Sequence, residues 1–161
     1  MAIIRGTRDA RQARGYEELI PDDAGDYKDE FIDLVGRMRT GYWPHIGVPC
    51  GWYKIVSELN RDIRNFTGDY TVLKVEHNNG ELIYNIRLLN NAVVDLSKVM
   101  AFVTSAKAKC RVTCEVCGAT GDERVVGNTL KVVCETHATQ LKAKRRRKQR
   151  TEDNDDDSTD L

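Results

Sequence analysis

The stretch CEVCGATGDERVVGNTLKVVCETH, residues 114–137, contains a Cys-x-x-Cys pair and, after a hairpin-length gap, a Cys-x-x-His pair. The two-residue spacer of the first pair and the glycine that follows it, Gly118, let two thiolates point at one ion. Residues 124–126 and 129–133 are short strand-like runs, joined at Gly127 and Asn128, which suit a two-residue hairpin turn. This hairpin would bring the second pair back to the first. The expected metal ligands are Cys114, Cys117, Cys134 and His137.

The ligand types in this stretch predict a structural metal rather than a catalytic one. The spacing of Cys134 and His137, i and i+3, places both side chains on one face of the first turn of a helix. Three thiolates and one imidazole suit a closed tetrahedral Zn²⁺ site, with no position left for an activated water. The alternative is a set of buried free thiols. Cys110 could replace one ligand or be a packed thiol, whereas Cys50 and His45 form no ligand set with their neighbours.

The remaining composition fits a chain from a reducing compartment. The 161 residues include five cysteines, an odd number that argues against a fully paired disulfide framework. The N-terminal sequence lacks the basic, apolar and small-residue order of a secretory signal. No apolar run approaches the roughly 20 residues that a bilayer span needs. We therefore expect a cytoplasmic protein with one Zn²⁺ and no membrane segment.

Two helices are expected before the centre of the chain. Residues 26–40 place apolar side chains on one face at helical spacing, with acids early and arginines late, as the helix dipole favours. Pro44 and the GVPCG segment at residues 47–51 then interrupt the chain. After them an apolar stripe follows at i, i+3, i+4, i+7 and i+11, which predicts a second helix. Its members are Trp52, Tyr53, Ile55, Val56, Leu59 and Ile63.

The next segments predict a hairpin and a third helix. Residues 69–89 alternate in strand fashion on both sides of Asn78, Asn79 and Gly80, which suit a turn with positive φ. Residues 90–109 then place an apolar face at helical spacing. That face comprises Val93, Leu96, Val99, Met100 and Val103. The order predicts an α+β fold, with helices packed on a small β-hairpin or sheet and a C-terminal treble-clef-like zinc module.

The chain divides by composition into four predicted parts. Residues 1–22 mix charges with few apolar positions and predict a flexible N-terminal arm. Residues 23–109 form the α+β core, and residues 110–141 the zinc-binding module. Residues 142–161 form a basic helical extension and a disordered acidic tail.

Knuckle, hairpin and ligand-bearing helix in this order resemble the treble-clef arrangement of zinc modules. The resemblance raises an enzymatic alternative, because HNH-type endonucleases use a similar frame with a catalytic metal beside it. Those nucleases need a histidine general base on the hairpin, and residues 122–133 contain no histidine. The sequence therefore disfavours a nuclease, and it offers no other recognisable catalytic group set.

A wider resemblance covers about residues 47–140. The segments GVPCGWYKIVSELNRDI, DYTVLKVEHNNGELIYNI, CEVCGATG and VVCETHA look like a family of small bacteriophage and bacterial proteins. In that family a CGxGWY helix start, a D-Y-x-V strand, a basic glycine-rich hairpin turn and a CExCG…CxxH zinc module follow in this order. This chain departs at the turn, where it reads EHNNGEL. The resemblance implies a fold and a phage origin and supplies no activity.

Charge is segregated along the chain although the formal net charge is zero. Residues 1–106 carry net −2, residues 107–150 net +8 and residues 151–161 net −6. Seven of the nine residues 142–150 are basic, and such a helix could lie along phosphates with salt-sensitive affinity and little sequence readout. The candidate nucleic-acid contacts are Lys142, Lys144, Arg145, Arg146, Arg147, Lys148 and Arg150.

These observations predict a non-enzymatic, zinc-stabilised binding protein, with DNA or RNA as its partner. One alternative is a protein-binding regulator or inhibitor of a host bacterial enzyme, or of a defence or transcription complex, acting through the α+β core. Another is that the basic run is a solvated chain end that only aids solubility.

Overall fold

The computed structural model describes residues 19–38, 45–88 and 95–144 of the chain. Its elements are η1 (Gly25–Tyr27), α2 (Lys28–Gly36), η2 (Cys50–Trp52), α3 (Tyr53–Thr67), β1 (Tyr70–Asn78), β2 (Glu81–Leu88), α4 (Leu96–Cys110), β3 (Asp122–Val126) and β4 (Thr129–Val133). Residues 135–144 form a further helix, called the ligand helix below because it carries His137. The strands form two antiparallel two-stranded sheets, so the predicted α+β class is confirmed.

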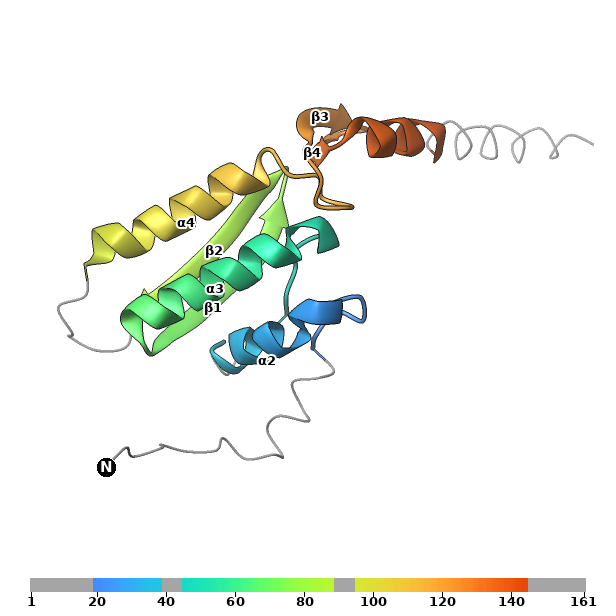
Figure 1. Cartoon of the computed structure of the whole chain (residues 1–161). Helices are drawn as coiled ribbons and strands as arrows, with labels where there is room; N and C mark the ends of the chain where they lie inside the picture. The colour runs from blue at the N-terminus through green and yellow to red at the C-terminus, as the bar shows by residue number, and fades with distance from the viewer. Residues whose placement is uncertain (1–18, 39–44, 89–94, 145–161) are drawn as a thin grey trace, which may run out of the picture.

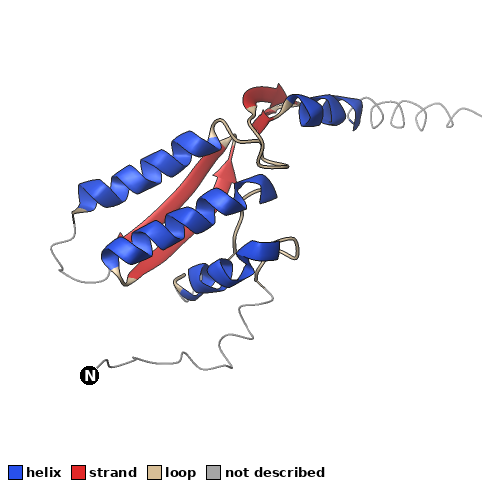
Figure 2. Cartoon of the chain, in the orientation of Figure 1, coloured by secondary structure: helices blue, strands red, loops and turns tan. Residues whose placement is uncertain are grey.

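The helices gather on the β1–β2 hairpin. Helices α3 and α4 lie side by side and run along the strands on one face of it, and α2 lies beside α3 (Figure 1). Phe66 of α3 and Phe102 of α4 meet edge to face at 5.9 Å between ring centroids. The β3–β4 hairpin and the ligand helix lie beyond the C-terminal end of α4 (Figure 2). Within the described ranges no helix is both long and apolar enough to cross a bilayer.

The stripe predicted for α3 is the centre of the core. Val56 and Ile63 are fully buried and Leu59 is 3% exposed. Trp52, at the end of η2, is fully buried as well. Their spacing places them on one side of the helix, so the helix forms where it can bury a continuous apolar face.

The β1–β2 hairpin turns where predicted but does not alternate as predicted. Asn79 and Gly80 have φ values of 47° and 77°, the two positive values that a type I′ turn requires. The register shifts between Val72 and Lys74, so a β-bulge accommodates Leu73, which is 40% exposed. The bulge turns Val75 inward together with Val72. The simple alternation expected for this strand is therefore wrong beyond Val72.

The buried face of α4 also differs from the prediction. Leu96 and Met100 are 59% and 52% exposed, although Val99 and Val103 are buried as expected. The buried face continues through Ala106 and Cys110 at i+7 and i+11 from Val99, with small side chains that allow close packing. Val93, the remaining member of the predicted face, lies outside the described residues.

The first α-helix is shorter than the helix predicted over residues 26–40. The core also begins earlier in the chain than predicted. The α-helix ends at Gly36, because the next residues pair with β1: the Val72 amide donates to the Arg37 carbonyl at 2.9 Å. Residues 1–18 of the predicted arm lie outside the described residues. Ile20, which belongs to the predicted arm of residues 1–22, is only 7% exposed and is part of the core.

A buried polar network joins α2, α3 and β1. The Asn60 amide nitrogen donates to Glu30 Oε1 at 2.8 Å and to Asp33 Oδ2 at 3.0 Å. Its amide oxygen accepts from the hydroxyl of Tyr70. Arg37 Nε donates to Asp33 Oδ2 at 2.8 Å. Asn60 is fully buried, so this network fixes the relative position of the two helices.

Candidate metal centre

The first ligand pair lies on a tight turn after α4, residues 114–119, called the knuckle below. The Cys114 amide donates to the Ala119 carbonyl at 2.7 Å, and the Gly118 amide donates to the Cys114 carbonyl at 3.0 Å. Gly118 has φ of 73°, a conformation that a residue without a side chain adopts at little cost. These bonds curl the chain so that both cysteines face one point.

The second ligand pair follows the β3–β4 hairpin. The strands pair from Asp122 with Val133 to Val126 with Thr129, and Gly127 at φ 71° makes the turn. The hairpin predicted between the ligand pairs is therefore present. Cys134 lies immediately before the ligand helix, and the Ala138 amide donates to its carbonyl at 2.9 Å.

The four predicted ligand residues come together. The ligand atoms of Cys114, Cys117, Cys134 and His137 all lie within 4.8 Å of one another. His137 presents Nδ1, at 3.5 Å from Cys114 Sγ and 3.1 Å from Cys134 Sγ. The sulfurs of Cys117 and Cys134 are 3.9 Å apart.

These separations fit one tetrahedral ion. At tetrahedral angles, bond lengths of about 2.3 Å to sulfur and about 2.0 Å to nitrogen imply separations of about 3.8 Å between two sulfurs and about 3.5 Å between sulfur and nitrogen. The distances from Cys114 to His137 and from Cys117 to Cys134 match these values, and that from Cys134 to His137 is shorter. The cluster could therefore hold one metal ion.

The backbone prepares the buried ligand for ionisation. Cys114 is fully buried, and burial opposes its thiolate, but amides of Cys134, Val116 and Cys117 donate toward the sulfur. The net effect lowers the pKa of Cys114 to about 6. Since metals bind the thiolate, this arrangement favours ligation at neutral pH.

The knuckle is attached directly to the start of α3. The Gly51 amide donates to the Glu115 carbonyl at 2.9 Å. The indole nitrogen of Trp52 donates to the Thr113 carbonyl at 2.8 Å. The thiol of Cys50 lies 3.1 Å from the Val116 carbonyl. Three consecutive residues of η2 thus bond to the knuckle or to Thr113 just before it, which ties the candidate metal centre to the core.

Glu115, between the two knuckle cysteines, is a buried carboxylate that sequence reasoning missed. It is 3% exposed, and it pairs with Val132 through both backbone and side chain, each bond being 2.8 Å. Its Oε1 lies 3.2 Å from His77 Nε2 and its Oε2 3.6 Å from Lys131 Nζ. Glu115 therefore joins the knuckle, β4 and the C-terminal end of β1.

The other cysteines and histidines take non-ligand positions within the described residues. Cys110 is fully buried in the core, and burial raises the pKa of its thiol to about 12. Cys50 is exposed beside the knuckle. His45 lies 3.8 Å from Glu76, and the ring of His77 packs edge to face on Trp52 at 5.3 Å.

The candidate nucleic-acid contacts are only partly described. Lys142 and Lys144 are exposed on the ligand helix. The predicted contacts that lie outside the described residues are Arg145, Arg146, Arg147, Lys148 and Arg150, and the predicted acidic tail lies outside them as well.

Comparison with protein-family models, with curated proteins and with solved structures found no match.

Proposed function

We propose that this chain is a non-enzymatic binding protein, stabilised by one structural Zn²⁺, that contacts nucleic acid through its basic segment, residues 142–150. We also propose that residues 110–141 form a treble-clef zinc module. The same proposal includes the phage origin that the sequence resemblance implies. So does residence in the bacterial cytoplasm, where the thiols would stay reduced.

The donor set favours zinc. Three thiolates and one imidazole are soft and borderline ligands that select Zn²⁺ over the oxygen-seeking Mg²⁺ and Ca²⁺. A shell filled by four protein ligands leaves no open position, so the metal would hold the knuckle and the ligand helix together. Its removal would then affect folding rather than a chemical step.

The main support for nucleic-acid binding is that the basic segment begins within the ligand helix, whose start the metal would fix. His137, a ligand, is followed after four residues by Lys142. Leu141 packs against the small cluster of Cys114, Val133 and Ala138, so the ligand helix is held on its inner side. Lys142 and Lys144 are exposed and have no ion-pair partner among the described residues.

Such a segment suits phosphate binding. Basic side chains that neutralise phosphates release counterions, so the affinity falls steeply as salt rises. The segment contains no aromatic side chain and thus offers no stacking platform for bases. We therefore expect contacts to the backbone of DNA or RNA with little sequence preference.

The test is a salt series with a variant that keeps the fold. All seven basic residues of the segment are changed to Gln, which preserves Leu141 and its packing, and binding to a mixed-sequence duplex and to an RNA hairpin is followed by fluorescence anisotropy. If all seven charges contact phosphates, the full chain gives a slope of about −6 in log affinity against log salt. The variant should lose most of that slope and at least about tenfold in affinity.

A chain ending at Arg150 is the matched control, because it removes the acidic tail and keeps the basic segment. We expect it to bind at least as tightly as the full chain, since the tail repels phosphates. Absence of binding by the full chain at low salt would overturn the proposal. A nuclease-resistant protein partner in a pull-down would then favour the alternative, a regulator of a host enzyme.

A further inference from the structure

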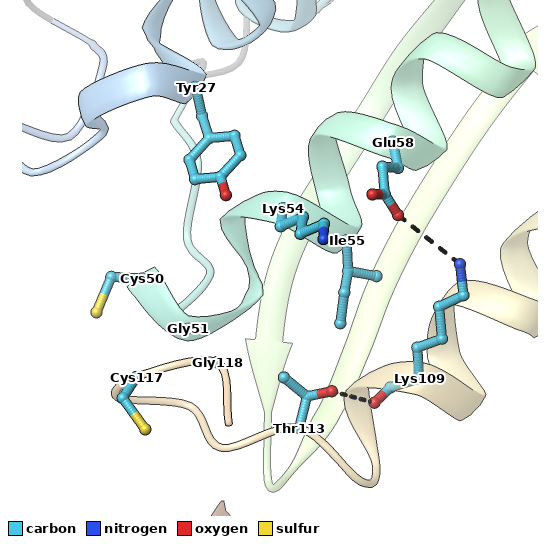
Figure 3. A pocket seen from close by; sticks show the side chains of 10 residues that line it. All are labelled: Tyr27, Cys50, Gly51, Lys54, Ile55, Glu58, Lys109, Thr113, Cys117 and Gly118. Carbon is cyan, nitrogen blue, oxygen red and sulfur yellow. Dashed lines mark hydrogen bonds and ion pairs between the residues drawn. The ribbon is translucent and has the colours of Figure 1, made fainter. Parts of the chain in front are cut away.

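A cavity of about 500 Å³ lies where the knuckle, the start of α3 and the end of α4 meet (Figure 3). Its size falls within the range of about 300–1,000 Å³ that is typical of small-molecule sites. Its walls come from segments far apart in the sequence, including Tyr27, Lys54, Lys109 and Gly118. The site would therefore exist only when the metal module is packed on the core.

The cavity offers cationic groups for an anion. Lys54 is exposed, lines the cavity and has no ion-pair partner among the described residues. Lys109 Nζ lies 3.8 Å from Glu58 Oε2, and both side chains are well exposed, so this ion pair is weak. Lys109 can therefore also contribute to holding an anionic ligand.

Backbone amides do not supply the donors here. The Gly51 amide is bonded to the Glu115 carbonyl and the Gly118 amide to the Cys114 carbonyl. The two glycines contribute no side chain to the wall between knuckle and η2, which Cys50 and Cys117 also line. Recognition of an anion would consequently depend on Lys54 and Lys109.

Two other residues that line the cavity are aromatic or apolar. Tyr27 points its hydroxyl into the space that Lys54 also faces (Figure 3). Its ring is held by Phe31 at 6.5 Å and, edge to face, by Tyr53 at 6.4 Å between centroids. Ile55 adds an apolar surface. A fixed aromatic ring beside the ammonium groups of Lys54 and Lys109 suits a ligand with a planar ring and an anionic end.

We propose that this cavity binds one nucleotide, with the phosphate on Lys54 and Lys109 and the base against Tyr27 and Ile55. The proposal deepens the proposed nucleic-acid function and rests on it for the choice of a nucleotide among aromatic anions. It uses no residue of the basic segment. The nucleotide is either free or the terminal unit of a single strand, since both present the same phosphate and base.

The experiment uses the full zinc-loaded chain and follows backbone amide resonances by NMR during titration with deoxyadenosine monophosphate, deoxyadenosine or inorganic phosphate. Saturable shifts at Tyr27, Lys54 and Gly118 are expected with the nucleotide, and weaker ones with either half alone. Lys54→Ala should weaken nucleotide binding about tenfold, as expected for loss of a charged contact. Arg61→Ala, the same charge change on the same helix, should leave it unchanged.

Tyr27→Leu supplies a second measure, because it removes the ring and keeps Lys54. It should weaken nucleotide binding several-fold without changing the binding of phosphate alone. Absence of saturable shifts, equal effects of Lys54→Ala and Arg61→Ala, or equal affinities for phosphate and nucleotide would each overturn the proposal.

Two further arms identify the source of the nucleotide and separate this proposal from the one on which it rests. The first arm compares a 5′-phosphorylated tetranucleotide with its unphosphorylated form and with the mononucleotide. Tightest binding of the phosphorylated tetranucleotide would identify a strand end as the ligand. Equal binding of the tetranucleotide and the mononucleotide would identify the free nucleotide. The chain with seven Gln substitutions in the basic segment should retain mononucleotide binding while losing duplex binding. Duplex binding by the full chain without any mononucleotide binding would refute the cavity proposal alone.

Discussion

A Cβ atom on Gly51 would lie 2.0 Å from the carbonyl oxygen of Cys114. The backbone just before α3 is therefore in direct contact with the backbone of Cys114, a candidate metal ligand. No residue other than glycine fits there without displacing the knuckle, which makes Gly51 a sensitive probe of the connection between core and metal centre.

Gly51→Ala should destabilise the fold and weaken metal binding together. The added methyl group meets backbone atoms rather than a movable side chain, so the expected cost is about 3 kcal/mol, the upper end for overpacking. Urea unfolding at fixed zinc and a competitive chelator titration would measure the two effects.

Gly127→Ala is the matched control for this prediction. Gly127 has φ of 71°, but no atom lies within 4 Å of the point that an added methyl group would occupy, so alanine there costs about 1 kcal/mol of backbone strain. Its zinc affinity should be unchanged. Equal losses of zinc affinity in both variants would contradict a specific role for Gly51.

Glu115 should contribute through its bonds rather than its volume. Glu115→Ala leaves the buried Val132 amide without its side-chain acceptor, and we expect a loss of about 3 kcal/mol. Glu115→Gln keeps an acceptor oxygen and should lose only about 1 kcal/mol. Urea unfolding of both variants, beside the exposed control Glu123→Gln, would test this order. Similar stabilities of the Ala variant and the control would refute it.

The Asn60 network should be costly to interrupt. Asn60→Ala removes partners from Glu30 and Asp33 on one side and from Tyr70 on the other. Since these groups are partly or fully buried, the expected loss is about 2–4 kcal/mol. Thermal unfolding of Asn60→Ala beside Asn65→Ala, an exposed position on the same helix, would check it, and equal melting temperatures would count against it.

Alkaline pH should destabilise the protein partly through Cys110. Well below pH 9 its thiol is neutral in both states. Above that pH the unfolded chain ionises, whereas burial raises the pKa in the folded protein to about 12, so the free energy of unfolding falls as pH rises between these values. The limiting slope is about 1.4 kcal/mol per pH unit.

Cys110→Ala removes this contribution. The variant should be less stable at pH 8, because it leaves a small cavity, yet its stability should fall less between pH 9 and pH 10. Burial also raises the pKa of Tyr70, to about 12, which adds to the loss at higher pH in both proteins. Parallel stability curves would show that Cys110 ionises equally in both states.

Local patterns made part of the fold predictable. The apolar stripe of α3 is visible in the spacing of residues within one helix. The turn at Asn79 and Gly80 depends on two residues that tolerate positive φ. The four residues of the ligand cluster were predictable for the same reason, since each pair has a characteristic spacing and a hairpin separates the pairs.

Irregularities and long-range contacts were not predictable in this way. The bulge at Leu73 inserts one residue and reverses the faces of the strand beyond it, which alternation alone does not reveal. On α4 the predicted apolar face and the observed buried face share Val99 and Val103. The buried face then continues through the small residues Ala106 and Cys110, which helical spacing alone does not indicate.

The attachment of the knuckle to the core belongs to the same class. Gly51 and Glu115 are far apart in sequence, so no local pattern indicates their contact. From the sequence alone a glutamate between two cysteines is expected at the surface. Its burial depends on the contacts with β4 and His77. The glycine at the start of α3 was the available signal, because a glycine at a helix start can mark a close backbone approach.

The anchored basic segment and the cavity both require the metal centre to be part of the folded core. Trp52 reports on this directly, because its buried indole donates to the Thr113 carbonyl just before the knuckle. The measurement is Trp52 fluorescence and thermal unfolding of a Trp43→Phe chain before and after removal of zinc by a chelator. We predict a red-shifted emission and a melting temperature lower by at least about 10 °C, both restored by zinc. Unchanged emission and melting in a chain shown to be free of metal would contradict the account.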